Sequence, residues 1–480
     1  MSLFLIIISP LAAALLSIFV KKNRLFIESF TMVSSIIEIL AGIMIIGEVV
    51  KNGHYSSGPY FSVDAFGAIL IMILITVASA ASVYSVKFLR EEVAREFIGF
   101  RRLKQHYVLF NLFIAAILLA VSTTNPIIMW VAIEATTLST AFLISFYNKP
   151  KATEAAWKYL IVNSIGLLLS FFGTLLFLAP SIKTAGILGP ISWDDIMRNA
   201  NNFDPYLIKV AFIFIFIGYG TKMGLVPMHT WLPDAHSKAP APTSSLLSGA
   251  LLNIAFFAIL RYKVVIDASI GQQFSQNLLM FFGVLSTLVA AFIIFIQKSY
   301  KRLLAYSSIE HMGIMALGFG FGGLGAFAAV LQMIYHSLVK TALFLLSGNA
   351  FLKYGSSKIK NVRGMISALP VTSVLFFIGV LIITGVPPFG IFLTEFHILS
   401  AGIAEHPYVV SAALFSFVLV FVGFLKHLIV MEFSEETVER GEAGLLTILP
   451  PAVLLALLIF IGFYIPEPIM ILIKSVALKY

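Results

Sequence analysis

Long apolar stretches separated by short polar segments run along the whole chain. A helix needs about 20 apolar residues to cross the hydrocarbon core of a bilayer, and these stretches meet that length. Their solid apolar character excludes a transmembrane β-barrel, whose strands alternate polar and apolar residues. We expect fourteen helical spans, at residues 2–20, 27–49, 66–86, 108–123, 127–147, 156–179, 207–228, 240–260, 277–297, 303–321, 325–352, 370–402, 408–431 and 445–473.

Composition supports a membrane protein. Of the 480 residues, 59% are hydrophobic and 11% are charged, whereas soluble domains carry about 25% charged residues. The absence of cysteine excludes a disulfide scaffold. The first span follows Met1 without a basic segment or a cleavage site, which favours a retained helix over a signal peptide. The predicted fold class is therefore an all-α polytopic membrane protein, with one integral membrane domain over residues 1–480.

The formal charge of +9 would suit a nucleic-acid partner, but cytoplasmic loops of membrane proteins collect Lys and Arg. The loops after odd-numbered spans hold most of the basic residues: Lys21, Lys22, Arg24, Lys87, Arg90, Arg95, Arg101, Arg102, Lys104, Lys149, Lys151, Lys298, Lys301, Arg302, Lys353, Lys358, Lys360 and Arg363. Loops after even-numbered spans hold few: Lys51, Lys183, Arg198, Arg261 and Lys263. This asymmetry predicts cytoplasmic odd loops, both termini outside, and no nucleic-acid partner.

Glycine and proline interrupt the apolar pattern in two places, at residues 224–242 and 385–390. Proline removes a backbone donor, and free backbone groups at membrane depth are tolerated only in a cavity or buried in protein. Paired breaks in two halves of a transporter indicate an inverted repeat with an ion site between them. For either break alone, the frequent occurrence of proline in membrane helices is an alternative. The glycine-rich segment 320–325 joins two spans and is predicted to be a tight turn.

Five ionisable residues stand out inside the apolar spans: Glu134, Lys222, His336, Lys340 and Glu395. Such a residue costs roughly 2.5–3.5 kcal/mol on insertion scales, so it normally pairs or lines a water path. Glu134 and Lys222 lie deep in separate helices, which favours a buried pair able to gain and lose protons, although a purely structural link is the alternative. His336 and Lys340, spaced i and i+4, share one helix face.

Three further pairs of polar residues have structural explanations that compete with a role in ion transfer: Glu310 and His311, His229 and His236, and Lys426 and His427. Glu310 and His311 suit structural hydrogen bonding inside the tenth span. His229 and His236 lie beside the first break, where interfacial solvation explains them equally well. Lys426 and His427 interrupt the thirteenth span and suit snorkelling to the membrane surface.

The segment 221–253, together with 301–313, closely resembles the antiporter-like proton-pumping subunits of respiratory complex I and the related multi-subunit cation/proton antiporters. It looks most like the hydrogenase-4 component F branch, found in membrane-bound group 4 nickel–iron hydrogenases and formate hydrogenlyase-type complexes. The resemblance implies fourteen helices with breaks in helices 7/8 and 12. It also implies two inverted five-helix repeats at 107–263 and 275–433, between an N-terminal part at 1–106 and a last helix at 445–480.

The resemblance also implies roles for the buried charges. Glu134 matches the family's fifth-helix glutamate and Lys222 its seventh-helix lysine, a pair thought to couple signals to proton movement. His336 and Lys340 match polar positions of helix 11, and Glu395 matches the exit-side position of helix 12.

One position departs from the family pattern. Where many members have a lysine in helix 8, this chain has Asn253, which cannot store a proton charge. A relay through His229, His236, Glu310, His311 or a water chain is the expected substitute, and the sequence leaves the choice open. The chain ends about seven residues after the last predicted span, so we expect no long lateral helix of the kind one complex I subunit carries.

We therefore expect an ion-translocating subunit of a prokaryotic oxidoreductase complex in the cell membrane of a bacterium or archaeon. No metal or cofactor is expected in this chain; nickel–iron and iron–sulfur centres would lie in partner subunits. The expected partners are other antiporter-like membrane subunits, hydrophilic hydrogenase and iron–sulfur subunits, and lipids. A cation/proton antiporter subunit without a redox partner, or a passive anchor or quinone-site scaffold, are the alternatives. Proton and sodium both remain open, because the hydroxyls of Thr136, Thr137 and Ser139 beside Glu134 would serve either ion.

Overall fold

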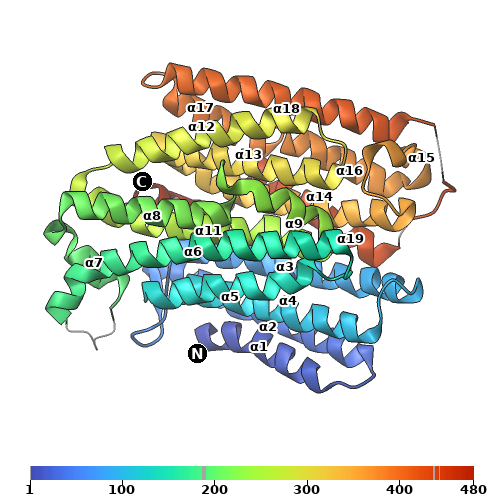
Figure 1. The fold of residues 1–480 in the computed structure, drawn as a ribbon, viewed down its shortest axis with the longest axis horizontal. Helices are drawn as coiled ribbons and strands as arrows, with labels where there is room; N and C mark the ends of the chain where they lie inside the picture. Colours follow the sequence, from blue (N-terminus) through green and yellow to red (C-terminus); the bar gives the residue numbers. More distant parts are fainter. Residues whose placement is uncertain (1, 186–190, 436–437, 443) are drawn as a thin grey trace.

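The computed structural model describes residues 2–185, 191–435, 438–442 and 444–480. Its helices run side by side along one long axis (Figure 1). Within the described residues, twelve helical segments are long and apolar enough to cross a membrane. The prediction of an all-α polytopic membrane protein is confirmed.

The N-terminal part contains four long helices and a short antiparallel hairpin. The side chain of Asn23 caps the second helix and that of Asp64 caps the third, each accepting a hydrogen bond from a first-turn backbone N–H. Between the third and fourth predicted spans, the sequence predicts a polar connection over residues 87–106. The connection in the structure is much shorter, because both flanking helices extend into this region and leave only residues 95–99 between them. The elements are α1 (Ser2–Phe19), α2 (Arg24–Asn52), β1 (His54–Ser56), β2 (Ser62–Asp64), α3 (Ala65–Ala94) and α4 (Phe100–Ser122).

The next part carries the first break. The seventh span is predicted at 207–228, but the candidate span in the structure reaches from Pro205 to Lys238. Its helix is interrupted at Gly224, which has a left-handed backbone (φ +85°), and it resumes after a 3₁₀ turn. A single turn of π-helix then interrupts the eighth span. The elements are α5 (Pro126–Ile144), α6 (Pro150–Ala185), α7 (Trp193–Arg198), η1 (Ala200–Asn202), α8 (Pro205–Met223), η2 (Met228–Trp231), α9 (Leu232–Lys238), α10 (Ala241–Leu246), η3 (Leu247–Leu251) and α11 (Leu252–Ile270). Residues 186–190, within the polar connection predicted at 180–206, lie outside the described residues.

The second break divides the twelfth predicted span into two helices on either side of Thr384–Phe389. The predicted tight turn is also present, since Gly322 and Gly323 have positive φ values and join two long helices. The elements are α12 (Gln273–Phe295), α13 (Tyr300–Phe321), α14 (Leu324–Tyr354), η4 (Ile359–Asn361), α15 (Met365–Ala368), α16 (Pro370–Ile383), α17 (Gly390–Gly402) and α18 (Pro407–Phe433).

The last predicted span, 445–473, is two helices. α19 (Leu445–Phe463) crosses the bundle, and α20 (Glu467–Ala477) is a separate short helix that buries one face against α2, α3 and α14. An ion-pair cluster fixes this end of the chain, because Asp64 accepts from Arg261 (2.8 Å) and Lys479 (3.3 Å). Burial alone would raise the pKa of Asp64, but these two cations outweigh it and hold the pKa well below its usual range.

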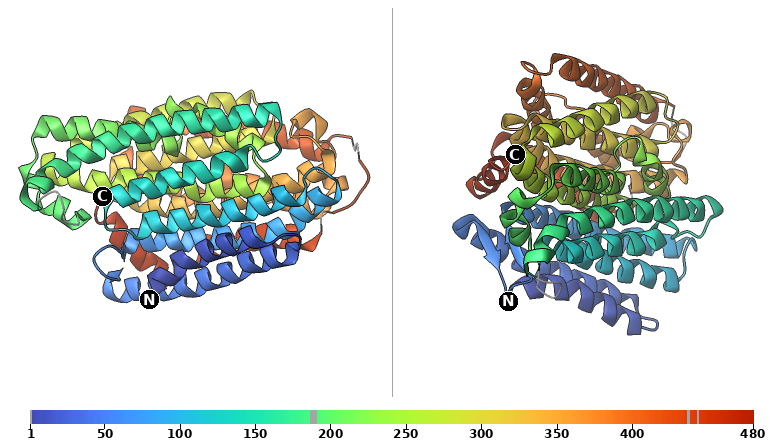
Figure 2. Two further views of the ribbon diagram at one scale, coloured as in Figure 1. Left: turned by 60° about the horizontal axis from the view of Figure 1, so that its bottom comes forward. Right: turned by 60° about the vertical axis from the view of Figure 1, so that its left-hand side comes forward.

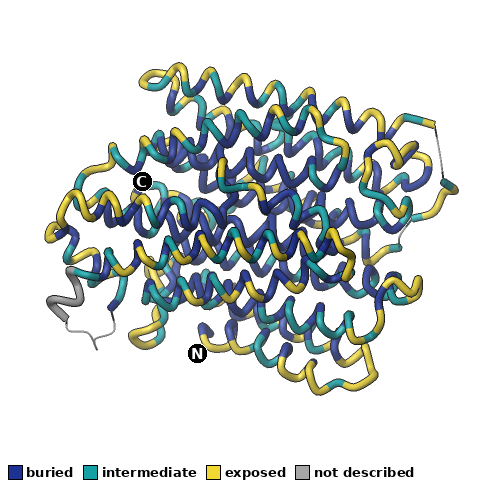
Figure 3. The backbone as a smooth tube through the Cα atoms, in the orientation of Figure 1, coloured by how far each residue is buried: buried dark blue, intermediate teal, exposed yellow. Residues whose placement is uncertain are grey.

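The centre of the bundle is α14, which packs against α3, α10, α13, α16, α17 and α19. Buried residues concentrate along this core, and exposed residues follow the outer helices and the two ends (Figure 3). Both termini lie toward one end of the bundle, and the turns from α1 to α2 and from α18 to α19 lie at the other (Figures 1 and 2). The prediction places those turns on the cytoplasmic side and both termini on the outer side. The arrangement of the helices is consistent with it, and the orientation itself stays a prediction.

Candidate ion-translocation site

Lys222 occupies the last turn of α8, directly before the first break, and is completely buried. Its Nζ donates hydrogen bonds to Thr137 Oγ1 on α5 (2.6 Å) and to the Tyr159 hydroxyl on α6 (2.9 Å). Thr137 in turn donates to Glu134 Oε2 (3.1 Å). Among the ion pairs of the described residues, none joins Lys222 directly to Glu134. The predicted pair is instead bridged by a threonine hydroxyl.

The glutamate itself is less buried than predicted. Glu134 is half-buried, and Val131 and Leu138 on the same helix are exposed. Ser164 of α6 donates to its second carboxylate oxygen (2.9 Å). The hydroxyls of Thr136 and Ser139 donate to backbone carbonyls of their own helix. Of the three hydroxyls expected to surround the glutamate, only that of Thr137 contacts it.

A row of aromatic rings leads from this lysine to the second half. Lys222 Nζ lies 5.1 Å from the ring centroid of Tyr159, whose ring contacts Trp231 at 5.0 Å. The imidazole of His236 on α9 follows, 6.5 Å from Trp231 and 5.3 Å from Phe344 of α14. This histidine is completely buried, and neither ring nitrogen has a hydrogen-bond partner among the described residues. A buried imidazole normally has a hydrogen-bond partner, so these two nitrogens set His236 apart from most buried histidines.

Lys340 is the counterpart in the second half. It lies in the middle of α14, completely buried, and its Nζ donates to Leu304 O (2.7 Å) and to the Ser307 hydroxyl on α13. His336 lies one turn earlier on the predicted common face, and both of its ring nitrogens lack partners in the described chain. Its ring lies 5.4 Å from that of His311. The helix-face prediction is therefore confirmed, and a second imidazole from α13 joins it.

His311 belongs to a hydrogen-bond chain that ends at the second break. Gln332 donates to its Nδ1 (2.8 Å), which leaves Nε2–H to donate to the Ile383 carbonyl at the end of α16 (3.0 Å). Thr394 of α17 donates to the side-chain oxygen of Gln332. Glu310 Oε2 lies 3.5 Å from His311 Nε2 and accepts no hydrogen bond from the described residues. The histidine therefore ties α13 and α14 to the unwound segment, while the glutamate next to it remains unsatisfied.

Glu395 lies on α17 directly under the turn of the second break. It is 7% exposed. Gly385 in that turn has φ +65°, and a Cβ at this position would overlap the Glu395 carboxylate. The glycine is required both for the left-handed backbone and for the space that the carboxylate occupies.

Two other predicted relay residues have specific structural roles or surroundings. Asn253 on α11 donates to Gly249 O (3.1 Å) and to the Ser337 hydroxyl of α14 (2.7 Å). It therefore links α11 to α14, and its Oδ1 has no partner in the described chain. His229 is only partly buried and lies 6.1 Å from the Tyr306 ring. It is not part of the aromatic row.

The structural explanation fits the pair in the thirteenth span. Lys426 lies over the Phe295 ring at 4.7 Å, and the His427 imidazole contacts the Ile294 carbonyl at 3.2 Å. Both residues join α18 to the end of α12.

The sequence analysis missed several buried ionisable residues, among them two acids on α2 and two lysines. Glu38 on α2 is 2% exposed and receives one hydrogen bond, from Ser34 (2.6 Å), and Glu28 on the same face pairs with Arg90. Their spacing with Thr31, one polar residue per turn, was the available signal. Lys263 is completely buried against Asp267, and Lys301, predicted in a loop, is 4% exposed inside α13.

Residues 123–421 match the family described as NADH:quinone oxidoreductase/Mrp antiporter, transmembrane. The match covers both breaks, both buried lysines and all the predicted relay residues. The chain belongs to this family.

Individual relatives support the assignment. A hydrogenase-4 component F homolog from Methylacidiphilum infernorum is 36% identical over 413 residues, which is 85% of this chain and 86% of that protein. NADH-quinone oxidoreductase subunit M of Rickettsia typhi is 25% identical over 393 residues, 78% of this chain and 75% of that protein. The predicted resemblance to the antiporter-like family, with the hydrogenase-4 branch among its relatives, is confirmed.

Two solved structures share the fold. One is the membrane-bound sulfane sulfur reductase, an archaeal respiratory membrane complex, with a TM-score of 0.86, 24% identity, and coverage of 100% of this chain and 96% of the matched chain. The other is the Mrp complex from Dietzia sp. DQ12-45-1b, with a TM-score of 0.86, 18% identity, and coverage of 99% and 96%. Family and fold together identify the protein as an antiporter-like subunit of the complex I and hydrogenase type of membrane complex.

Among the described residues, no three His, Asp or Glu side chains converge as a metal site would require. The polar side chains described above therefore form separate clusters and do not form one set of metal ligands.

Proposed function

We propose that this chain moves protons across the cell membrane of a bacterium or archaeon, as one subunit of a hydrogenase-linked respiratory complex. The observation that carries the proposal is the pair of completely buried lysines, Lys222 and Lys340, each held by neutral oxygen atoms within its own half. A cation at membrane depth is costly unless it has a function, and neither lysine has a direct carboxylate partner among the described residues. Such a group can release its proton when its electrostatic surroundings change.

The proposed sequence of events begins at the half-buried Glu134. A charge or conformational change in a partner subunit alters this carboxylate, and the Thr137 hydroxyl transmits the change to Lys222, which releases a proton. The proton passes through water near His236 to Lys340 and His336, and then by Glu310 toward Glu395. Water is assigned to this route because the imidazole nitrogens of His236 and His336 are buried without partners in the described chain. The two repeats, at 107–263 and 275–433, would each supply one lysine.

Protons are favoured over sodium because of the surroundings of Glu134. A desolvated metal cation needs several oxygen atoms whose lone pairs point at it. Here the contacting hydroxyls of Thr137 and Ser164 both donate their hydrogens to the carboxylate. This geometry suits a carboxylate that exchanges protons.

We place the redox chemistry in partner subunits that would carry nickel–iron and iron–sulfur centres, with further antiporter-like subunits beside this chain in the membrane. The hydrogenase-4 relative supports that assignment. A subunit of a cation/proton antiporter without a redox partner is the second candidate, and the similarity to the Mrp complex fold favours it. The subunits that co-purify in mild detergent distinguish the two.

The decisive experiment uses the intact complex in proteoliposomes, with redox-driven proton uptake measured by a pH-sensitive dye and sodium by a tracer. Lys222→Ala and Glu134→Gln should abolish or strongly reduce proton uptake. Lys209→Ala, an exposed lysine of the same helix α8, and Glu154→Gln, an exposed acid at the start of α6, are the matched controls and should pump normally. Undiminished proton uptake in both test variants, or sodium movement in place of protons, would refute the proposal.

A further inference from the structure

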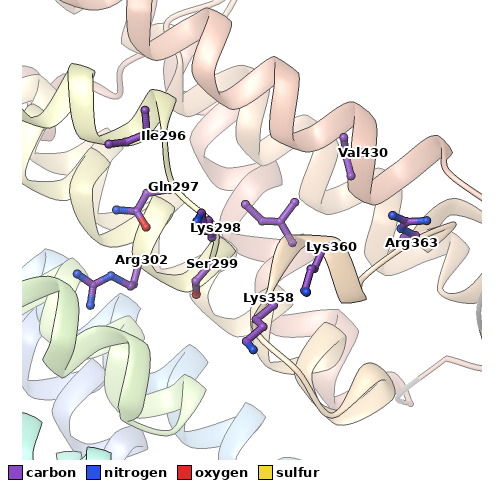
Figure 4. Close-up of a pocket in the computed structure, with 10 residues that line it drawn as sticks. Ile296, Gln297, Lys298, Ser299, Arg302, Lys358, Lys360, Arg363 and Val430 are labelled. Carbon is purple, nitrogen blue, oxygen red and sulfur yellow. The ribbon is translucent and has the colours of Figure 1, made fainter.

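A strongly basic groove is lined by residues of the turn between α12 and α13 and of the segment after α14 (Figure 4). Its volume is about 810 Å³. Three segments form it: the turn from α12 to α13 at 296–302, the segment after α14 at 358–363, and Val430 of α18.

The groove has a fixed shape. Backbone bonds join the first two segments, from Ile359 N to Lys298 O (3.0 Å) and from Tyr300 N to Ser357 O (3.1 Å), and Ser299 pairs with Lys358 as an isolated bridge. These bonds fix the backbones of the two segments relative to each other, so the basic side chains extend from neighbouring positions.

Its charges are not balanced within the chain. Arg302 is paired with Asp234. The side chains of Lys298, Lys358, Lys360 and Arg363 form no ion pair with any described residue. Four like charges around one cavity repel one another, so the groove gains most from an anionic occupant.

The other wall is apolar and open to the membrane. Ile296 is 69% exposed and Val430 is 36% exposed, and Phe292, one turn deeper on α12, is 55% exposed. This wall continues along α12 and α18, which pack against each other and extend into the bilayer region. A cationic end joined to an apolar wall is complementary to a molecule with an anionic head and a hydrocarbon tail.

We infer that this groove binds an anionic phospholipid. Its phosphate lies among Lys298, Lys358, Lys360 and Arg363, and an acyl chain lies along Ile296, Val430 and Phe292. Basic pockets between transmembrane helices are suited to such headgroups. Four cations without an ion pair in the described part of the chain favour a headgroup with two phosphates, as in diphosphatidylglycerol, over one with a single phosphate. An acidic segment of a partner protein would match the charges but not the exposed apolar wall.

The test measures lipid retention by the full-length chain, purified in mild detergent, using native mass spectrometry. The probes are diphosphatidylglycerol, phosphatidylglycerol, phosphatidylcholine and the soluble headgroup glycerophosphoglycerol. The test variant is Lys358→Gln with Lys360→Gln, and the control is Lys21→Gln with Lys22→Gln, two exposed lysines of the turn from α1 to α2. The charge-preserving variant Lys358→Arg with Lys360→Arg is the positive control, and thermal unfolding verifies that all variants are folded.

We expect diphosphatidylglycerol to bind most tightly and phosphatidylcholine least. Retention should fall about tenfold or more in the test variant, because two charges near the phosphate are removed. It should remain unchanged in the control and in the arginine variant. Equal losses in test and control variants would mean general attraction to the basic end and would overturn the inference. So would equal binding of phosphatidylcholine, full competition by the soluble headgroup, or loss of a co-purifying protein in the test variant with lipid retention unchanged. The result does not depend on ion transport, so it stands apart from the proposed function.

Discussion

Thr137 joins Lys222 to Glu134, since its hydroxyl accepts from Lys222 and donates to Glu134. No other described residue hydrogen-bonds to both side chains. Thr137→Val keeps the shape of the side chain and removes the hydroxyl. Lys222 would then keep only the Tyr159 hydroxyl of its two partners, and Glu134 would keep only Ser164. The variant therefore separates the acid from the base and leaves both in place.

The size of the effect follows from these bonds. A hydrogen bond to a charged group contributes about 1.5–3 kcal/mol, and about 1.4 kcal/mol corresponds to a tenfold change in rate. The rate of redox-driven proton uptake should thus fall about 10- to 100-fold in proteoliposomes containing the intact complex. Thr137→Ser keeps the hydroxyl and should restore most of the activity. Thr76→Val is the control, because the Thr76 hydroxyl donates only to its own helix, at Met72 O. Normal pumping by Thr137→Val would show that the hydroxyl bridge has no part in coupling.

Three more predictions address other parts of the protein. Gly385→Ala should displace the Glu395 carboxylate and force an unfavourable left-handed alanine, lowering the unfolding temperature in detergent by an amount equivalent to roughly 1–2 kcal/mol, and reducing pumping. Asn253→Ala should lower thermal stability by about 1–3 kcal/mol, because its hydrogen bond to Ser337 of α14 is lost. Pumping per folded complex should stay within about twofold, since we assign this residue a linking role. Asp64 has a lowered pKa in the folded protein, so its stabilising effect is complete above its unfolded pKa of about 3.9 and is lost as pH falls below that value. Thermal unfolding followed from pH 7 downward should show this loss, and Asp64→Asn, which weakens the pair with Arg261, should be less stable at neutral pH and show a smaller loss.

Each has a clear contrary result. Gly47→Ala is the matched control for the glycine variant, because a Cβ at Gly47 meets no atom within 4 Å; equal effects of the two would contradict the steric argument. A complete loss of pumping in a stable Asn253→Ala complex would give this residue a direct part in proton transfer. An unchanged pH profile in Asp64→Asn would mean that another carboxyl governs acid stability.

Much of the architecture could be predicted from the sequence. Apolar runs of membrane length predicted fourteen spans, and twelve helical segments of the described residues are long and apolar enough to cross a membrane. The agreement is close because a bilayer imposes a nearly fixed length on any helix that crosses it. Glycine and proline located both breaks. The boundaries were less accurate where helices extend beyond the apolar region, as at Phe100, or continue after an interruption, as at Leu232. Hydropathy does not register a helical turn that lies in the headgroup region or inside a polar cavity.

The candidate site was only partly predictable. Charge in an apolar span selected the two lysines, and both are completely buried. The same rule overestimated the burial of Glu134, because a residue in mid-span can face either the core or the outside of the bundle. It also passed over Glu38, which lies in an apolar span but has no base nearby in sequence. Which face of each helix points inward is set by its neighbours.

The sequence by itself therefore determined that this is a helical membrane protein of the antiporter-like family, and it selected several of the charges that lie inside the spans. Both follow from the cost of placing polar groups in hydrocarbon, which is paid residue by residue along the chain. Only the tertiary structure decided how those charges are connected. The Thr137 bridge, the aromatic row to His236 and the fit of Glu395 under Gly385 each join residues from different helices. Hydrogen bonds act over about 3 Å, so they depend on how the helices pack, and this information is not present in any one segment.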